Sequence, residues 1–286
     1  MPSLIDLRRR IRSVRNTQQV TKAMKMVSAA KLRRAQERVL QARPYATIFR
    51  EVLADVSAAV AGDERLGSHP LLAHRPERRI ALLVLTSDRG LAGAFNSNLI
   101  RAAQAFVREH ESAEVSMVLL GRKGRDFFRK NNARIIGERV GLMQSVRYQD
   151  AAEIAADIIA RFEREEIDAA YAVYNEFKSV VSQKLSVVPI LPLSIPEGGS
   201  GRDYIYEQPP EELLGTLLPR YVEIAVYQAM LESSASEHAA RMTAMESATS
   251  NATEMIDKLT LYMNRVRQAS ITTEIIEVVS GAAAAV

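Results

Sequence analysis

The sequence has no cysteine and no tryptophan among its 286 residues. Without cysteine, the chain cannot form disulfides, thiolate zinc sites, iron–sulfur clusters or thiol nucleophiles, and this composition fits a reducing compartment. Long apolar runs are also lacking: the longest, residues 80–85 and 281–286, fall far below the roughly 20 residues of a membrane-spanning helix. The N-terminus has no apolar segment of the kind found in signal peptides. We therefore expect a chain that is neither secreted nor membrane-spanning by its own sequence.

Helix breakers are missing from the last quarter of the chain. No proline follows Pro219, and no glycine falls between Gly215 and Gly281. Residues 220–280 are therefore predicted to form one helix of roughly 90 Å, which is too long for a small domain and must protrude. A long core helix in a bundle would show the same periodicity, but the length favours a coiled coil. The apolar stripe of this helix consists of Met245, Ala248, Ala252, Met255, Leu259, Tyr262, Val266, Ala269, Thr273 and Ile276.

Residues 3–43 also contain neither proline nor glycine, which predicts a second long helix. Pro44 is expected to end or kink it, and a further helical stretch is predicted over residues 45–61. The stripe turns polar at residues 16–19, where amide side chains are expected to face the packing partner and fix the register. Its members are Leu4, Leu7, Ile11, Val14, Gln18, Thr21, Met24, Val27, Leu32, Ala35 and Val39.

The net charge of +4 is unevenly distributed. Residues 1–43 carry twelve lysine and arginine residues against two acidic ones, whereas residues 220–286 carry five against eight. Complementary charge and matching stripes predict that the two terminal helices pair with each other, in an antiparallel coiled coil. A basic segment can also bind nucleic acid, but residues 1–44 hold no aromatic residue on which bases could stack.

The middle of the chain alternates short apolar runs with amphipathic stretches, which predicts a largely parallel sheet covered by helices. The overall fold class is therefore α+β: a long antiparallel coiled coil of the terminal helices with a central Rossmann-like α/β domain. The predicted division is a helical part (1–61), a linker (62–77), the α/β domain (78–208) and the C-terminal helix (209–286). Strands are predicted over residues 80–86, 115–120, 134–136, 169–173 and 179–190, and helices over residues 96–110, 124–130 and 150–165.

Two turns invite a functional interpretation. Residues 87–96, SDRGLAGAFN, follow the first strand, where open α/β sheets hold nucleotide phosphates. The turn matches neither GxGxxG nor GxxxxGK[ST], so we interpret it as structural, like the second turn at residues 121–124. His69 and His74 lie in a loop with no third metal-ligand type nearby, which favours a solvated loop. We expect no catalytic constellation, metal or cofactor.

Three long motifs carry a family resemblance. They are IRSVRNTQQVTKAMKMVSAAKLRRAQ near the N-terminus, TSDRGLAGAFNSNL in the middle, and the stretch from SEHAARMTAMESATSN to VVSGAAAA near the C-terminus. Together they closely resemble the gamma subunits of rotary F-type ATP synthases. The resemblance implies a non-catalytic central-stalk rotor in single copy, which couples proton flow to ATP synthesis or hydrolysis and is involved in regulating both. It also implies a surrounding ring of alpha and beta subunits, with epsilon and the membrane c-ring at the foot.

Carried over by motif, the resemblance implies a set of contacts with that ring and a peripheral location on the cytoplasmic face of the bacterial inner membrane. The short alanine-rich end is expected to turn within an apolar sleeve. Lys25 departs from the family pattern, since many relatives resemble AMEMV with a glutamate there, and the regulatory dithiol of the chloroplast type is excluded by the lack of cysteine. The implied contact residues are Lys22, Met24, Lys25, Lys31, Arg33, Arg34, Arg267, Gln268, Ser270, Ile271, Thr272 and Val286.

Two rival functions remain at this stage. One is a nucleotide-binding α/β enzyme with a coiled-coil arm, suggested by the turn at Gly90. The other is a basic coiled-coil protein that binds nucleic acid, for which salt-sensitive binding would be diagnostic.

Overall fold

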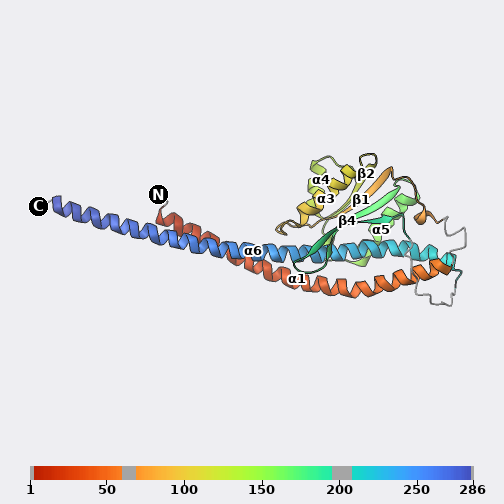
Figure 1. The fold of residues 1–286 in the computed structure, drawn as a ribbon, viewed down its shortest axis with the longest axis horizontal. Coiled ribbons are helices and arrows are strands. Elements are labelled where there is room, and N and C mark those ends of the chain that lie inside the picture. Colours follow the sequence, from red (N-terminus) through yellow and green to blue (C-terminus); the bar gives the residue numbers. More distant parts are fainter. Residues whose placement is uncertain (1–2, 60–68, 195–207, 285–286) are drawn as a thin grey trace. The chain divides into compact units, whose positions relative to one another are not determined.

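A computed structural model describes residues 3–59, 69–194 and 208–284 (Figure 1). By its internal contacts the chain divides into two compact units. The first, called the coiled-coil unit, holds α1 up to Ser28 and α6 from Met242 on; the second, called the sheet unit, is Ala29–Arg241. The two units are described separately below. No helix in the described ranges is both long and apolar enough to cross a membrane.

The two terminal helices are long, as predicted. Helix α1 runs over Leu4–Ala59 and helix α6 over Pro210–Ala284. In the coiled-coil unit they are antiparallel: Gln18 contacts Thr253, Thr21 contacts Thr249 and Lys25 contacts Glu246, so positions rise on one helix as they fall on the other. The predicted antiparallel pairing is thus confirmed, and Figure 1 shows α6 extending past the N-terminal end of α1.

Pro44 does not end α1, contrary to one of the two outcomes expected from the sequence. Proline removes the bond from its own nitrogen to the carbonyl four residues earlier, at a cost of about 3 kcal/mol in a helix interior. In the sheet unit, Leu32, Val39, Ala46 and Leu53 are all buried and repeat every seven residues on both sides of Pro44. This continuous packed stripe holds the helix together across the proline. The predicted residues 60 and 61 lie outside the described ranges.

The sheet unit contains a five-stranded sheet in the order β3-β2-β1-β4-β5. Four strands are parallel: β1 (Arg79–Leu85), β2 (Glu114–Leu120), β3 (Ile135–Arg139) and β4 (Ala169–Phe177). Strand β5 (Gln183–Leu191) pairs antiparallel with β4 at the edge. The central strand β1 is buried on both faces, which accounts for its unbroken apolar run.

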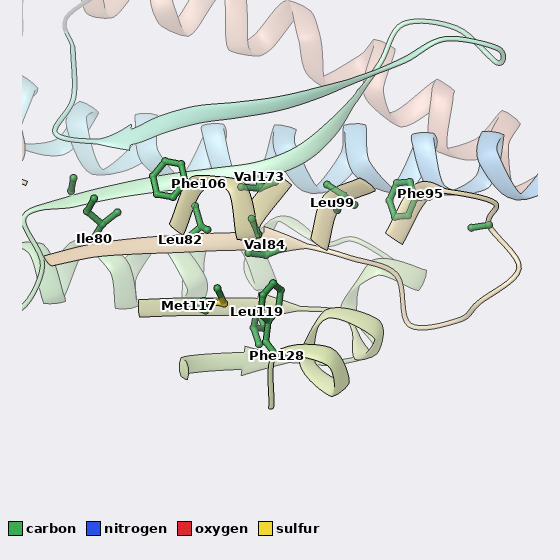
Figure 2. Packing of buried hydrophobic residues seen from close by; sticks show 13 residues of the cluster. Ile80, Leu82, Val84, Phe95, Leu99, Phe106, Met117, Leu119, Phe128 and Val173 are labelled. Carbon is green, nitrogen blue, oxygen red and sulfur yellow. The ribbon is translucent and has the colours of Figure 1, made fainter. Parts of the chain in front are cut away.

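Helices connect the parallel strands, as the alternating pattern predicts. They are α3 (Phe95–Glu109), α4 (Arg122–Lys130) and α5 (Tyr148–Glu163), with short 3₁₀ turns at Pro70–Leu72 (η1) and Leu142–Gln144 (η2). The chain steps from β1 to β2 to β3 in one direction and then returns to β4. Because such crossovers are right-handed, α5 covers the face opposite to α3 and α4. Figure 2 shows the core on the α3 side, which includes Leu82, Leu99, Phe106, Leu119 and Phe128.

The last two strands, β4 and β5, differ in their bounds from the strands predicted over residues 169–173 and 179–190. Strand β4 is four residues longer than expected and β5 begins four residues later, because Ser179–Ser182 forms the turn between them, with the amide of Ser179 bonded to the carbonyl of Ser182 at 2.9 Å. Pro189 lies within β5, where proline is tolerated because β5 is an edge strand and the register shifts nearby. Strand β3 also extends three residues past its prediction.

Candidate functional site: a polar helix segment at the carboxyl ends of the strands

The glycine-containing turn after β1 is held in place by hydrogen bonds of Ser87 and Asp88. The Asp88 carboxylate, which is buried, accepts the amide hydrogens of Arg122 at 3.1 Å and Gly141 at 3.0 Å. The Ser87 hydroxyl donates to the carbonyl of Arg89 at 2.6 Å, and the amide of Ser87 donates to the side chain of Asn96 at 2.9 Å. The amide and the hydroxyl of Ser87 are therefore used within the turn, and Asp88 connects the turn to the starts of the two following segments.

The second turn is structural for a steric reason. Gly121 has φ = 90°, and a Cβ there would lie 2.1 Å from the carbonyl oxygen of Thr86. A Cβ on Gly124 would lie 2.8 Å from the Thr86 hydroxyl, which accepts the amide hydrogen of Gly124 at 2.8 Å. Glycine is required at both positions so that α4 can start directly against the end of β1.

In an open α/β sheet, ligands bind outside the carboxyl ends of the strands, where the strand order reverses. Here that point lies between β1 and β4. Helix α6 covers it. The hydroxyl of Ser233 donates to the carbonyl of Leu85 at the end of β1, at 3.3 Å, and the hydroxyl of Ser236 donates to the carbonyl of Asn175 in β4, at 2.9 Å. The chain therefore fills with its own helix the place where a nucleotide would bind.

This part of α6 is buried all round. Residues 229–239 are all buried, although the segment reads AMLESSASEHA and includes two glutamates, three serines and a histidine. Small side chains allow α6 to approach the sheet closely enough for the serine hydroxyls to reach backbone carbonyls, which satisfies them without water. We call residues 232–241 the polar segment of α6.

Two charged residues of the polar segment, Glu232 and Arg241, each bond the backbone of a loop or strand end. Glu232, 2% exposed, accepts the amide hydrogen of Phe177 at 2.9 Å and pairs with Arg43 of α1 at 2.9 Å. Arg241 pairs with Glu237 at 2.7 Å and donates to the carbonyl of Arg89 at 3.1 Å. Desolvation raises the pKa of Glu237 in spite of the charge of Arg241.

His238 is the least satisfied member of the polar segment. It is 6% exposed, and its Nδ1 has no hydrogen-bond partner in the part of the chain that the structure describes. Burial, together with the charges of Arg241 and Lys31, lowers the pKa of His238 to about 4, so that the ring is neutral near pH 7.

The coiled-coil unit has a polar seam. Thr21 and Thr249 share a hydrogen bond between their hydroxyls at 2.8 Å, and the amide of Gln18 donates to the Thr253 hydroxyl at 2.7 Å. Of the polar residues 16–19, only Gln18 is half-buried against α6, whereas the other three are exposed. A groove of about 700 Å³ between the helices is lined by Gln18, Gln19, Lys22, Lys25, Met26, Glu246, Thr249, Ser250 and Thr253.

The implied contact residues are distributed over both units. In the coiled-coil unit, Met24, Lys25 and Ser270 are half-buried, and Lys25 pairs with Glu246 at 2.6 Å, which gives this unusual lysine a partner within the chain. The exposed members are Lys22, Arg267, Gln268, Ile271 and Thr272 there, and Lys31, Arg33 and Arg34 in the sheet unit. Val286 lies outside the described residues.

Among the described residues, no group of three or more histidine or acidic side chains could hold a metal ion. His69 instead caps η1, since its Nδ1 accepts the amide hydrogen of Leu71 at 3.2 Å, and His74 is exposed.

The sequence reasoning missed the polar segment. Its signal was the run of small and polar residues without an apolar stripe, in the middle of an otherwise periodic helix. That run indicates close packing, but it does not name the partner.

Comparison with known proteins identifies the family. A family model described as ATP synthase matches residues 3–285. The ATP synthase gamma chain of Solibacter usitatus is 66% identical over 285 residues, which cover 100% of both chains. The chain belongs to the ATP synthase gamma chain family. Another gamma chain, from Pelotomaculum thermopropionicum, is 53% identical over 287 residues and covers 99% of both chains.

Solved structures agree with this membership. The central stalk and c-ring structure of the Tetrahymena thermophila mitochondrial ATP synthase contains a chain with a TM-score of 0.59 and 26% identity, matching 80% of this chain and 99% of that one. A chain of the Euglena gracilis mitochondrial enzyme has the same fold, with a TM-score of 0.67 at 22% identity over 98% of this chain and 94% of that one.

As a member of the gamma chain family, the protein is a central-stalk subunit of the F-type ATP synthase and a non-catalytic part of that complex. This membership decides against both rivals, the nucleotide-binding enzyme and the nucleic-acid-binding coiled coil.

Proposed function

We propose that this chain is the rotating shaft that couples transmembrane proton flow to ATP synthesis or hydrolysis in a ring of alpha and beta subunits, and that it takes part in regulating ATPase activity and proton flow. The observation that carries the proposal is an unpaired apolar end of α6 in the coiled-coil unit. It suits a shaft whose tip is enclosed by other subunits.

The pairing of α1 with α6 leaves this end uncovered. In the three observed pairs, each residue further along α1 lies opposite a residue about one position earlier in α6. Extending this antiparallel register places Leu4, the first residue of α1, opposite the stretch around Arg267. Beyond Arg267, α6 has no described residue of α1 opposite it. Exposed apolar side chains gather there: Ile271 (48%), Ile275 (57%), Ile276 (59%), Val278 (71%) and Val279 (61%). A contiguous exposed apolar patch is typical of an interaction surface.

The proposed ring contacts are the residues carried over from the family motifs, Val286 included. Lys22, Lys31 and Arg34 are exposed and have no ion-pair partner among the described residues, so their charges are available to acidic loops of a partner. Lys25 is different, because Glu246 already neutralises it. We therefore propose that Lys25 contributes less to ring binding than Lys22 does.

A shaft can drive three equivalent catalytic sites in turn only if it contacts them unequally, because a partner that binds all states equally shifts no equilibrium. A two-helix rod provides such inequality, since α1 and α6 present different side chains to different sides. The proposal therefore needs a single copy of this chain in each complex.

The sheet unit is proposed to contact epsilon and the c-ring at the foot of the stalk, with the complex on the cytoplasmic face of the bacterial inner membrane and this chain peripheral to it. We retain the division at residues 61, 77 and 208 as part of this proposal.

The test is purification of the tagged full chain from its own cells after gentle solubilisation of the membranes. Native mass spectrometry is expected to find one copy with three copies each of two larger subunits, and ATP hydrolysis that depends on the larger subunits. A chain that emerges alone would refute the proposed assembly.

A further inference from the structure

The sheet unit contains a cavity of about 210 Å³, for which the proposed function names no ligand, although Lys31 and Arg34 of its lining are also proposed ring contacts. One wall is a face of α1. Lys31, Arg34 and Arg38 lie three or four residues apart there, so their side chains share that face. Within the described ranges, none of the three has a hydrogen bond or an ion pair. Three like charges on one helix face are unfavourable unless a counter-charge is nearby.

The opposite walls supply polar groups without negative charge. Gln144 and Ser145, at the end of η2, are exposed to the cavity, and α6 contributes Ser234 and His238. The Ser234 hydroxyl is already used, since it donates to the carbonyl of Met143 at 3.2 Å. His238 is more than nine-tenths buried and lines the cavity, and its Nδ1, which is itself shielded from solvent, has no hydrogen-bond partner among the described residues, although buried polar atoms are almost always bonded.

The charges around His238 come from two elements. From α1 they are Lys31, Arg34 and Arg38; from α6 they are Arg241 and Glu237, which pair with each other. The η2 loop contributes no titratable side chain to the lining. None of the described residues that line the cavity is a carboxylate, so the described lining has a surplus of positive charge and of hydrogen-bond donors.

We propose that this cavity binds a phosphate-class oxyanion, held by Lys31, Arg34 and Arg38 and by the buried ring of His238. Arginine pairs with phosphate through two parallel N–H bonds, which suits a tetrahedral oxyanion. The volume of about 210 Å³ is enough for one phosphate group together with its remaining hydration water.

The proposal is separable from the ring contacts. Lys31 and Arg34 belong to both sets, whereas Arg38 and His238 belong only to the cavity. Arg33 is the matched control: it is on the same helix, its side chain is 84% exposed, it pairs with Glu37 at 3.2 Å, and it does not line the cavity. Arg38→Gln and Arg33→Gln therefore remove the same charge inside and outside the proposed site.

The experiment titrates the purified full chain with inorganic phosphate at constant ionic strength, by calorimetry. Saturable one-to-one binding is expected, with Arg38→Gln weakening it at least roughly tenfold, which corresponds to about 1.4 kcal/mol, and Arg33→Gln leaving it unchanged. No saturable binding, or equal weakening in both variants, would overturn the proposal. Circular dichroism on each variant verifies that the helices are retained.

A second readout follows His238 itself. Nitrogen-detected imidazole signals of the full chain should show the titration midpoint of His238 moving upward when phosphate is added, because a nearby anion favours the charged ring. The same shift in Arg33→Gln and its absence in Arg38→Gln support the site, and an unchanged midpoint in the native chain contradicts it. Repeating the titration with ADP distinguishes free phosphate from the terminal phosphate of a nucleotide. If the site prefers a nucleotide, ADP should shift the His238 midpoint at a lower concentration than inorganic phosphate does.

Discussion

Gly121 lies where the turn after β2 meets the end of β1, and it shows how one missing side chain decides a local fold. Its φ of 90° is shared by Gly141, but the two differ in their surroundings: a Cβ on Gly121 would lie 2.1 Å from a backbone oxygen, whereas a Cβ on Gly141 would meet no described atom within 4 Å. They also differ in ψ, which is 146° at Gly121 and −15° at Gly141, so that Gly121 has both the tighter surroundings and the backbone conformation that is less accessible to other residues.

We predict that Gly141→Ala costs about 1–2 kcal/mol of unfolding free energy, from strain alone. Gly121→Ala adds the displacement of the Thr86 carbonyl, directly after β1, and a less accessible backbone conformation, and should cost at least about 1–3 kcal/mol more. Urea unfolding of the full chain measures both. Equal costs would mean that the backbone of Thr86 moves aside without penalty.

His238 makes stability depend on pH. Its pKa of about 4 in the folded chain is below the ordinary value of 6.5, so the unfolded chain binds more protons between these two values. The stabilisation that comes from keeping the ring neutral is complete above pH 6.5 and is lost as the pH falls towards 4. It amounts to about 3 kcal/mol.

Accordingly, the native chain should lose more stability than His238→Gln between pH 6.5 and 4, in phosphate-free buffer. Thermal unfolding of both chains at a series of pH values measures this difference in stability. The contribution of Glu237 cancels in the comparison, because both chains retain that residue. His74→Gln, at an exposed position, should keep the native pH dependence. Parallel curves for the native chain and His238→Gln would disprove the assignment.

At the scale of the element, the buried carboxylate of Glu232 connects three parts of the sheet unit: α6, the end of β4 and α1. Glu232→Ala would leave the amide of Phe177 buried without an acceptor and would remove the ion-pair partner of Arg43, which retains its bond to the carbonyl of Phe177 at 3.2 Å. We expect a loss of about 1–3 kcal/mol. Glu246→Ala is the control, because its pair with Lys25 is exposed and such pairs contribute at most about 1 kcal/mol. Similar losses in the two variants, measured by urea unfolding, would contradict this ranking.

The elements themselves were largely readable from the sequence. The absence of helix breakers predicted α1 and α6, and the alternation of apolar runs predicted the parallel strands and their helices. Helix α1 continues beyond Pro44 because its apolar stripe, which repeats every seven residues, also continues beyond the proline. Local helix propensity does not take this tertiary packing into account. The start of β5 depended on a serine turn, and the length of β4 depended on its partner strand, which is a tertiary effect.

For the candidate sites too, some features could be predicted from the sequence and others could not. The two glycine turns were interpreted as structural because they match no phosphate-binding motif, and the steric requirement for glycine at positions 121 and 124 agrees with that interpretation of the second turn. The burial of the polar segment of α6 could not be predicted from the sequence, because Glu232, His238 and Arg241 are buried by residues far away in the chain. A charged side chain in a helix predicts an exposed face unless the partner is known.

At the scale of the whole molecule, the unpaired end of α6 should matter only in the assembled complex. Replacing both Ile275 and Ile276 by lysine is expected to lower the yield or the ATP hydrolysis rate of the complex, since charge would enter an apolar contact. The unfolding free energy of the free chain should change by less than about 0.5 kcal/mol, because both residues are exposed. Gln104→Lys, on the exposed side of α3, is the matched control. A complex with full yield and full rate would refute the proposed role of this end.

The burial of residues 229–239 also has a consequence for how fast this part of the sequence can change in evolution. A helix normally has a solvent face on which substitutions accumulate without effect, but this stretch has none. Each of its serines lies against a backbone carbonyl or a packed side chain, so that most single replacements either overlap with a neighbour or leave a polar atom unbonded. Neutral drift should therefore be slow here and fast on the two flanking stretches of the same helix, and insertions within the stretch should be absent from viable descendants.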